Sequence, residues 1–189
     1  MTSTAPIQRL SVPALVLTAL LALFLASPLA HAASAAEIDS EVNQALKDFQ
    51  KIEGAKAYLS IAKGVLVFPK VYKAGIGVGG EYGEGALRVG GKTVAYYSTA
   101  AASIGFQLGA QAKTIVVLFT DKSALQKFRE SEGWKVGVDG SVALVDIGAG
   151  KAVDTTTIKD PVIGFIFGQK GLMYNLTLEG AKFTKLDKK

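Results

Sequence analysis

The chain has 189 residues, no cysteine and a single histidine, His31. Disulfides and thiolate nucleophiles are therefore excluded, and imidazole chemistry would depend on that one residue. The length suits one domain with a leader, and the net charge of +5 allows contact with an anionic surface without indicating nucleic acid.

Residues 1–32 have the features of a secretory signal peptide. Arg9 precedes an apolar segment at residues 15–26, which is shorter than the roughly 20 residues of a membrane-spanning helix, and Ala30-His31-Ala32 fits the small-x-small cleavage pattern. Cleavage there would remove Arg9 and His31, which lowers the net charge to +4 and leaves no histidine. A domain held together without disulfides after export is typical of bacteria, so we expect the periplasm or the periplasmic face of a membrane.

An N-terminal helical segment is predicted at residues 33–54. Ser34 and Glu37 have capping-box spacing, and apolar residues follow at intervals of three and four from Ile38 onward. Gly54 interrupts this pattern, which continues weakly to residue 62. The acidic residues early in the helix favour packing on a sheet over a place in a membrane interface, where Lys and Arg are preferred.

Short strands joined by turns are predicted for the rest. Residues 64–68 form an apolar run that we expect Pro69 to end, and Gly90-Gly91 is a two-residue hairpin signal. Strands are then predicted at 104–111 and 114–119, followed by a helix at 121–129 with a capping box at Ser123. Two hairpins follow, one over 134–147 with its turn at Asp139-Gly140 and one over 162–178 with its turn at 168–171. A frayed Lys-rich tail is expected at 182–189. The expected fold is α+β and mainly antiparallel β. We expect a curved Gly-rich sheet or small barrel-like sandwich over 55–181, with the helical segment and one short internal helix.

Two motifs that suggest enzymes are rejected. Gly75-x-Gly77-x-x-Gly80 matches the dinucleotide fingerprint, but turn-like residues follow it where a helix is needed. Glu81 and Glu84 could be a glycosidase pair, yet two carboxylates three apart in a Gly-rich turn are expected to be solvated. No metal-ligand spacing occurs either. The sequence therefore predicts no catalytic residues, no metal and no cofactor.

A group of basic residues surrounds the first predicted strand: Lys63, Lys70, Lys73 and Arg88. Near an anionic lipid surface each cation contributes about 1 kcal/mol, so four together would give weak, salt-sensitive binding. We therefore predict these four residues as the lipid-binding site. A nucleic-acid partner is not expected, because the charge is low and export removes the chain from the cytosol.

Residues 62–85, Ala-Lys-Gly-Val-Leu-Val-Phe-Pro-Lys-Val-Tyr-Lys-Ala-Gly-Ile-Gly-Val-Gly-Gly-Glu-Tyr-Gly-Glu-Gly, resemble the SYLF domain family. The resemblance continues through 105–111, 116–119 and 124–128, and covers about residues 55–181. It implies a non-enzymatic lipid-binding module, since eukaryotic members are described as phosphoinositide-binding and a fungal branch as actin-binding. The three lysines fall inside the shared motif. For an exported bacterial member we expect anionic membrane phospholipid as the partner, and a protein partner stays open.

Two alternatives remain at this stage. A small outer-membrane β-barrel is favoured by the leader and the Gly- and aromatic-rich strands. It is disfavoured by the uniformly apolar runs at 64–68 and 114–119, because a barrel strand alternates. A periplasmic carrier with an internal apolar cavity is the second alternative, and the sequence does not separate it from surface binding.

Overall fold

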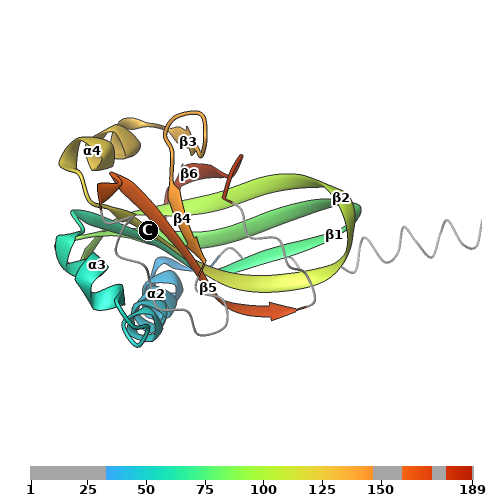
Figure 1. Ribbon diagram of the computed structural model, residues 1–189, viewed down its shortest axis with the longest axis horizontal. Helices are drawn as coiled ribbons and strands as arrows, with labels where there is room; N and C mark the ends of the chain where they lie inside the picture. Colours follow the sequence, from blue (N-terminus) through green and yellow to red (C-terminus); the bar gives the residue numbers. More distant parts are fainter. Residues whose placement is uncertain (1–32, 147–158, 172–177, 189) are drawn as a thin grey trace, which may run out of the picture. The chain divides into compact units, whose positions relative to one another are not determined.

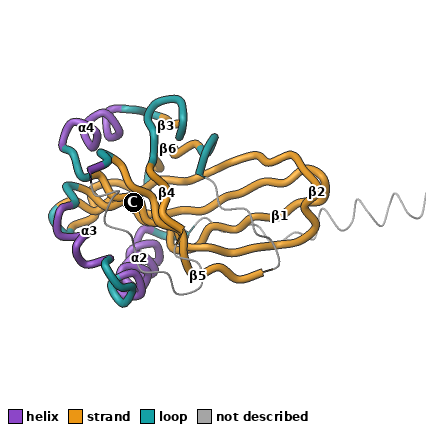
Figure 2. Tube along the Cα trace, viewed as in Figure 1, coloured by secondary structure: helices purple, strands orange, loops and turns teal. Residues whose placement is uncertain are grey.

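The computed structural model describes residues 33–146, 159–171 and 178–188. The predicted signal peptide lies outside these residues, as do the end of the 134–147 hairpin and nearly all of the strand expected at 172–178. Ala33–Lys189 forms a compact unit of its own. Its described part is α+β with a curled mixed sheet, which confirms the predicted fold class (Figures 1 and 2). The elements are α2 (Ala35–Phe49), α3 (Ala55–Ile61), β1 (Gly64–Val89), β2 (Lys92–Phe119), α4 (Lys122–Glu130), β3 (Gly133–Lys135), β4 (Ala143–Asp146), β5 (Val162–Gly171) and β6 (Lys182–Leu186).

Side-chain caps mark the starts of α2 and α4. The amide of Ser34 donates to Glu37 Oε2 at 2.7 Å, and the amide of Glu37 donates back to Ser34 Oγ at 3.3 Å, so the predicted capping box is confirmed. Gly54, with φ of 83°, separates α2 from α3. The capping box predicted at Ser123 is wrong, because the side chain of Asp121 caps α4 by accepting from the amide of Ala124 at 2.9 Å.

The strands β1 and β2 form one long antiparallel hairpin. Its turn is Gly90-Gly91, with φ of 58° and 78°, as predicted. Pro69 does not end the strand, contrary to expectation. A register shift between Phe68 and Val71 accommodates the missing N–H, and the Pro69 carbonyl accepts from Thr114 Oγ1 at 3.0 Å. The glycine-rich stretch that read as turns is therefore continuous strand.

This hairpin folds back on itself near Gly75. A Cβ placed there would lie 2.3 Å from the Cα of Gly79, and the register shifts again between Ile76 and Val78. The two halves of β1 then come into backbone contact, since a Cβ on Gly85 would lie 1.9 Å from the carbonyl oxygen of Val67. Only glycine permits such an approach. We call the part of the hairpin from residue 71 to 83 and from 99 to 113 the folded end.

The rest of the sheet is built around β2. Residues 96–100 of β2 pair with β6, residues 111–119 pair with β5, and the strand order is β3-β6-β2-β5-β4 with β1 on β2. The hairpin predicted around Asp139-Gly140 is wrong: β3 pairs with β6, and β4 runs parallel to β5. The expected frayed tail is also wrong, because β6 occupies residues 182–186.

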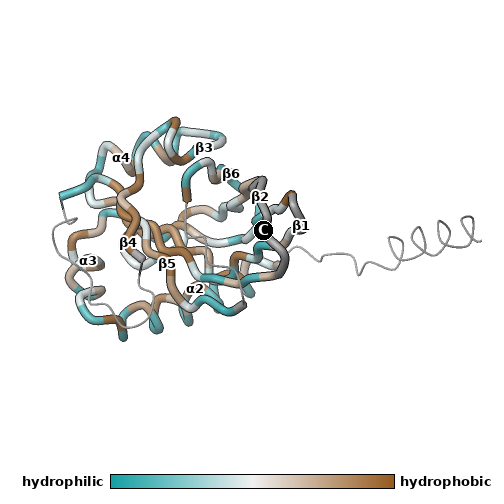
Figure 3. The backbone as a smooth tube through the Cα atoms, turned by 45° about the vertical axis from the view of Figure 1, so that its right-hand side comes forward, coloured by the Kyte–Doolittle hydropathy of each residue, from teal (hydrophilic) through white to brown (hydrophobic). Residues whose placement is uncertain are grey.

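The two faces of the sheet carry separate cores. On one face α2 and α3 pack on the strands, with Phe165 between them at ring-centroid distances of 5.0 Å from Phe49 and 5.1 Å from Tyr58. On the other face the curl closes over Phe128 of α4, 4.8 Å from Phe119. Figure 3 shows β5 among the hydrophobic parts of the chain, and its residues 162–167 are buried. The three described helices lie at the end of the domain away from the bend of the hairpin (Figure 1), and α2 reaches the folded end only at its start, where Tyr72 and Ala112 line a pocket with it.

Candidate functional site

The four cations predicted to bind lipid do not share one open face. Lys63 is exposed and lines a groove together with Arg88. Lys70 lies on the other side of α2, where it forms an ion pair with Glu41. Lys73 is only 5% exposed and lies inside the curl. The structure thus brings Lys63 and Arg88 together, while a common lipid-binding role for the four stays a prediction.

The groove shared by Lys63 and Arg88 has a volume of about 720 Å³ and runs between α2, α3 and the β1–β2 turn. Its charged lining residues are Lys47, Lys63 and Arg88, and none of the described residues that line it is acidic. We call it the cationic groove. The Arg88 guanidinium is held in place, because it donates to the carbonyl of Gly91 at 3.2 Å and to Asp39 Oδ1 at 3.3 Å. Ammonium and guanidinium groups in this arrangement suit a phosphate or carboxylate.

Lys47 is the member of the groove that sequence reasoning missed. It lies in the last turn of α2, on what reads as the solvent face of an amphipathic helix. The position of that face next to Lys63 depends on how α2 docks on the sheet. Asp39 fixes the docking by accepting from Thr93 Oγ1 at 2.6 Å and from Tyr96 OH at 3.0 Å, contacts that span more than fifty residues of sequence.

The inner face of the folded end carries several buried polar residues beside the buried Val71. Lys113 Nζ lies 2.8 Å from Glu81 Oε2, and these side chains are 1% and 6% exposed. The contact is a charge pair. Lys73 and Gln111 lie opposite each other in the register, and the Gln111 amide and the Thr99 hydroxyl have no hydrogen-bond partner among the described residues. We call these five residues the inner polar cluster; the prediction that Glu81 is solvated is wrong.

The outer face of the same strands is apolar and exposed. Tyr72, Val78 and Tyr82 are 60%, 68% and 51% exposed, respectively. The small residues Ala74, Gly80, Ala100, Ala102 and Ala110 are exposed alongside them. We call these eight residues the bare face. Its members alternate along the strands with those of the inner polar cluster, because successive side chains point to opposite faces of a sheet.

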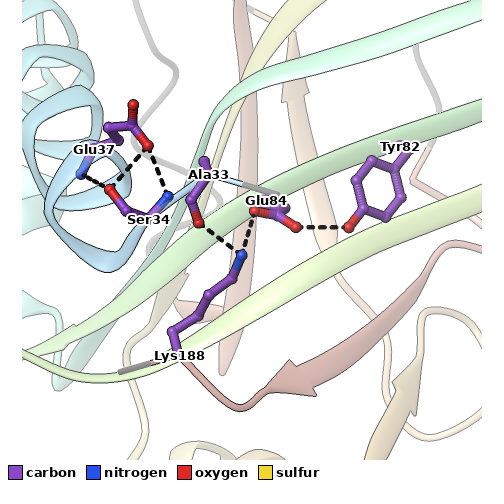
Figure 4. Close-up of polar contacts among 6 residues, drawn as sticks. All are labelled: Ala33, Ser34, Glu37, Tyr82, Glu84 and Lys188. Carbon is purple, nitrogen blue, oxygen red and sulfur yellow. Dashed lines mark hydrogen bonds and ion pairs between the residues drawn. The ribbon is translucent and has the colours of Figure 1, made fainter. Parts of the chain in front are cut away.

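A hydrogen-bonded link closes the border of the bare face (Figure 4). Tyr82 donates its hydroxyl to Glu84 Oε1 at 2.9 Å, and Lys188 Nζ lies 2.8 Å from both Glu84 Oε2 and the carbonyl of Ala33. Burial and the hydrogen bond to Glu84 raise the pKa of Tyr82 to about 12. Tyr82 therefore stays a neutral donor, and the start of the domain is tied to β1 and to the end of the chain.

The described ranges contain neither a metal-binding cluster nor a membrane-spanning helix. No group of three or more carboxylates there is placed to hold a metal ion. None of the helices in those ranges has both the length and the apolar character needed to cross a bilayer.

Comparison with known families identifies a match in the second half of the chain. Residues 100–189 match the Ysc84 family, which is described as "Las17-binding protein actin regulator". The matched range starts inside β2 and runs through β6, while β1 and α2 precede it. A comparison with curated proteins finds no match.

Proposed function

Because this chain belongs to the SYLF domain family, to which Ysc84 belongs, we propose that it is a non-enzymatic binding module for anionic lipid in a bacterial cell envelope. The family description names contacts with partners, Las17 binding and actin regulation, and no reaction. The absence of cysteine, with His31 as the single histidine, agrees with a role that needs no nucleophile or imidazole base. Lipid phosphate replaces the cytoskeletal partners in this proposal.

The observation that supports an anionic partner is the cationic groove. Lys47, Lys63 and Arg88 line it without a carboxylate among the described lining residues. Each unpaired cation near an anionic membrane surface contributes about 1 kcal/mol, so Lys47 and Lys63 would contribute about 2 kcal/mol before screening by salt, while Arg88 is already paired with Asp39. Of the other predicted residues, Lys70 would have to exchange Glu41 for a lipid phosphate, and Lys73 would take no part.

Replacing Lys47 and Lys63 together by Ala is expected to weaken binding to anionic vesicles about 30-fold, because two contributions of about 1 kcal/mol are lost. The measurement is flotation of residues 33–189 with phosphatidylcholine vesicles that do or do not contain phosphatidylglycerol. The Arg88 side chain is left unchanged, since it also holds α2 through Asp39.

The matched control is Lys127→Ala, which removes an exposed lysine of α4 outside the groove. It should bind like the unmodified domain. Equal recovery of the unmodified domain with neutral and anionic vesicles, or no effect of 0.5 M salt, would contradict an anionic lipid partner.

Export is part of the proposal. With the leader intact in the gene, the mature protein is expected in the periplasmic fraction with Ala33 as its first residue, because Ala30-His31-Ala32 fits the cleavage rule. Intact-mass spectrometry of the fractionated protein measures this. A protein found in the cytosol with residues 1–32 still attached would contradict it.

A further inference from the structure

The folded end of the hairpin reverses the usual arrangement of a soluble domain. Lys113 is 2% and Glu81 8% exposed, whereas Val78 and Tyr72 on the opposite face are 68% and 60% exposed. Burying charges and exposing apolar side chains both cost free energy in water, and exposed apolar groups that gather on one part of a surface mark contact sites. Contact of the exposed side chains with an apolar partner or phase would remove them from water and so lower the free energy of this arrangement.

The order of residues along β1 indicates what kind of apolar contact this is. From Lys70 the outer positions pass through Tyr72 to Val78 at the bend, then through Tyr82 to Glu84. Tyr72 lies three residues before Gly75, and Tyr82 lies three residues after Gly79. The two halves of β1 on either side of the bend therefore each have an aromatic ring at the same distance from it. Tyrosine is enriched where an apolar phase meets water, because its ring is apolar and its hydroxyl polar.

We propose that this bend enters the acyl region of one leaflet, with Tyr72 and Tyr82 at the level of the headgroups. Three strand residues at about 3.3 Å each place the bend about 10 Å beyond the tyrosines. This depth matches shallow insertion and is far short of the roughly 30 Å of a hydrocarbon core.

The charges at the border of the bare face fit an anionic leaflet. Lys70 borders the face on β1, where it is paired with Glu41, and Lys170 is exposed on the same side of the sheet, because it lies opposite Ala112 in the register. The carboxylate at the border, Glu84, is already paired with Lys188. The inference rests on the proposed function and deepens it. The cationic groove and the bend lie at opposite ends of the hairpin, so the groove supplies a salt-sensitive contact in one orientation and the bend supplies an apolar contact, which salt does not weaken, in another.

A pair of matched valines tests the insertion. Val78→Asp is expected to weaken binding to anionic vesicles about tenfold or more and to leave only salt-sensitive binding, since an aspartate opposes entry into hydrocarbon. Val138→Asp changes a valine that is 71% exposed but lies outside the hairpin, and it should bind like the unmodified domain. Because both valines are exposed, neither change is expected to alter the circular dichroism spectrum.

The absence of cysteine allows a direct reading of depth. Val78→Cys, labelled with the environment-sensitive dye NBD, should shift its emission to the blue on binding and should be quenched by spin-labelled acyl chains. The same label at Val138→Cys should do neither. A label at residue 78 that stays in water while the protein binds vesicles would overturn the insertion and leave the proposed function standing.

Two further outcomes are decisive. If the unmodified domain binds no vesicle of either composition, both the insertion and the lipid-binding function are overturned. If light scattering shows a dimer that Val78→Asp dissociates, a second copy covers the bare face and the insertion is overturned.

Discussion

Glu81→Gln is expected to lower the free energy of unfolding by about 3–5 kcal/mol, the largest effect of any single charge removal in the described structure. Glu81 is the carboxylate 2.8 Å from Lys113 Nζ, whose side chain is 1% exposed. Without it an ammonium group stays buried with no opposite charge, beside Lys73, which is also buried. Urea unfolding of residues 33–189 measures the change.

Two further variants test whether the unpaired ammonium group of Lys113 causes the loss of stability. Glu53→Gln removes an exposed carboxylate and should leave the unfolding midpoint where it is. The double variant Glu81→Leu and Lys113→Met should recover most of the lost stability, because it removes both charges from the interior. A single variant as stable as the unmodified domain would mean that water reaches the inner polar cluster freely.

Gly85→Ala is expected to destabilise the domain by about 3 kcal/mol or to prevent folding, through overpacking. The new Cβ would lie 1.9 Å from the carbonyl oxygen of Val67, and two backbones cannot separate there without opening the contact between the halves of β1. Thermal unfolding followed by circular dichroism is the measurement.

Gly80→Ala is the matched control, in the same strand and on the exposed face. No atom lies within 4 Å of its added Cβ, so the variant should be as stable as the unmodified domain or slightly more stable, as glycine is unfavourable inside a strand. Equal losses at both positions would show that strand propensity, and not the backbone contact, sets the cost.

The sequence predicts the elements whose signals are local. Ser34 with Glu37 and the apolar spacing after them place α2, and Gly90-Gly91 places the hairpin turn. The continuity of β1 was not predicted, because Pro69 and the glycines signal interruption by themselves, while the register shift and the backbone contact that use them depend on distant residues.

The candidate site was predicted less well for the same reason. Lysine is normally exposed, so Lys73 read as a surface cation, and no local signal marks it as an inward residue of a curled sheet. Lys47 and Lys63 meet only because Asp39 docks α2 on β2 and β1. Alternation along residues 71–83 could have revealed the two faces of the folded end, had this stretch been taken as strand.

The central place of β2 in the sheet also affects the order and the rate of folding. Residues 96–100 pair with residues 182–186, so the central strand is completed only when the last strand of the chain arrives. Contacts that join such distant parts of a chain slow folding, because the loop between them must close before the pairing gains anything. The domain is therefore expected to fold as a whole, once residues 182–186 are available, and to do so slowly for its size.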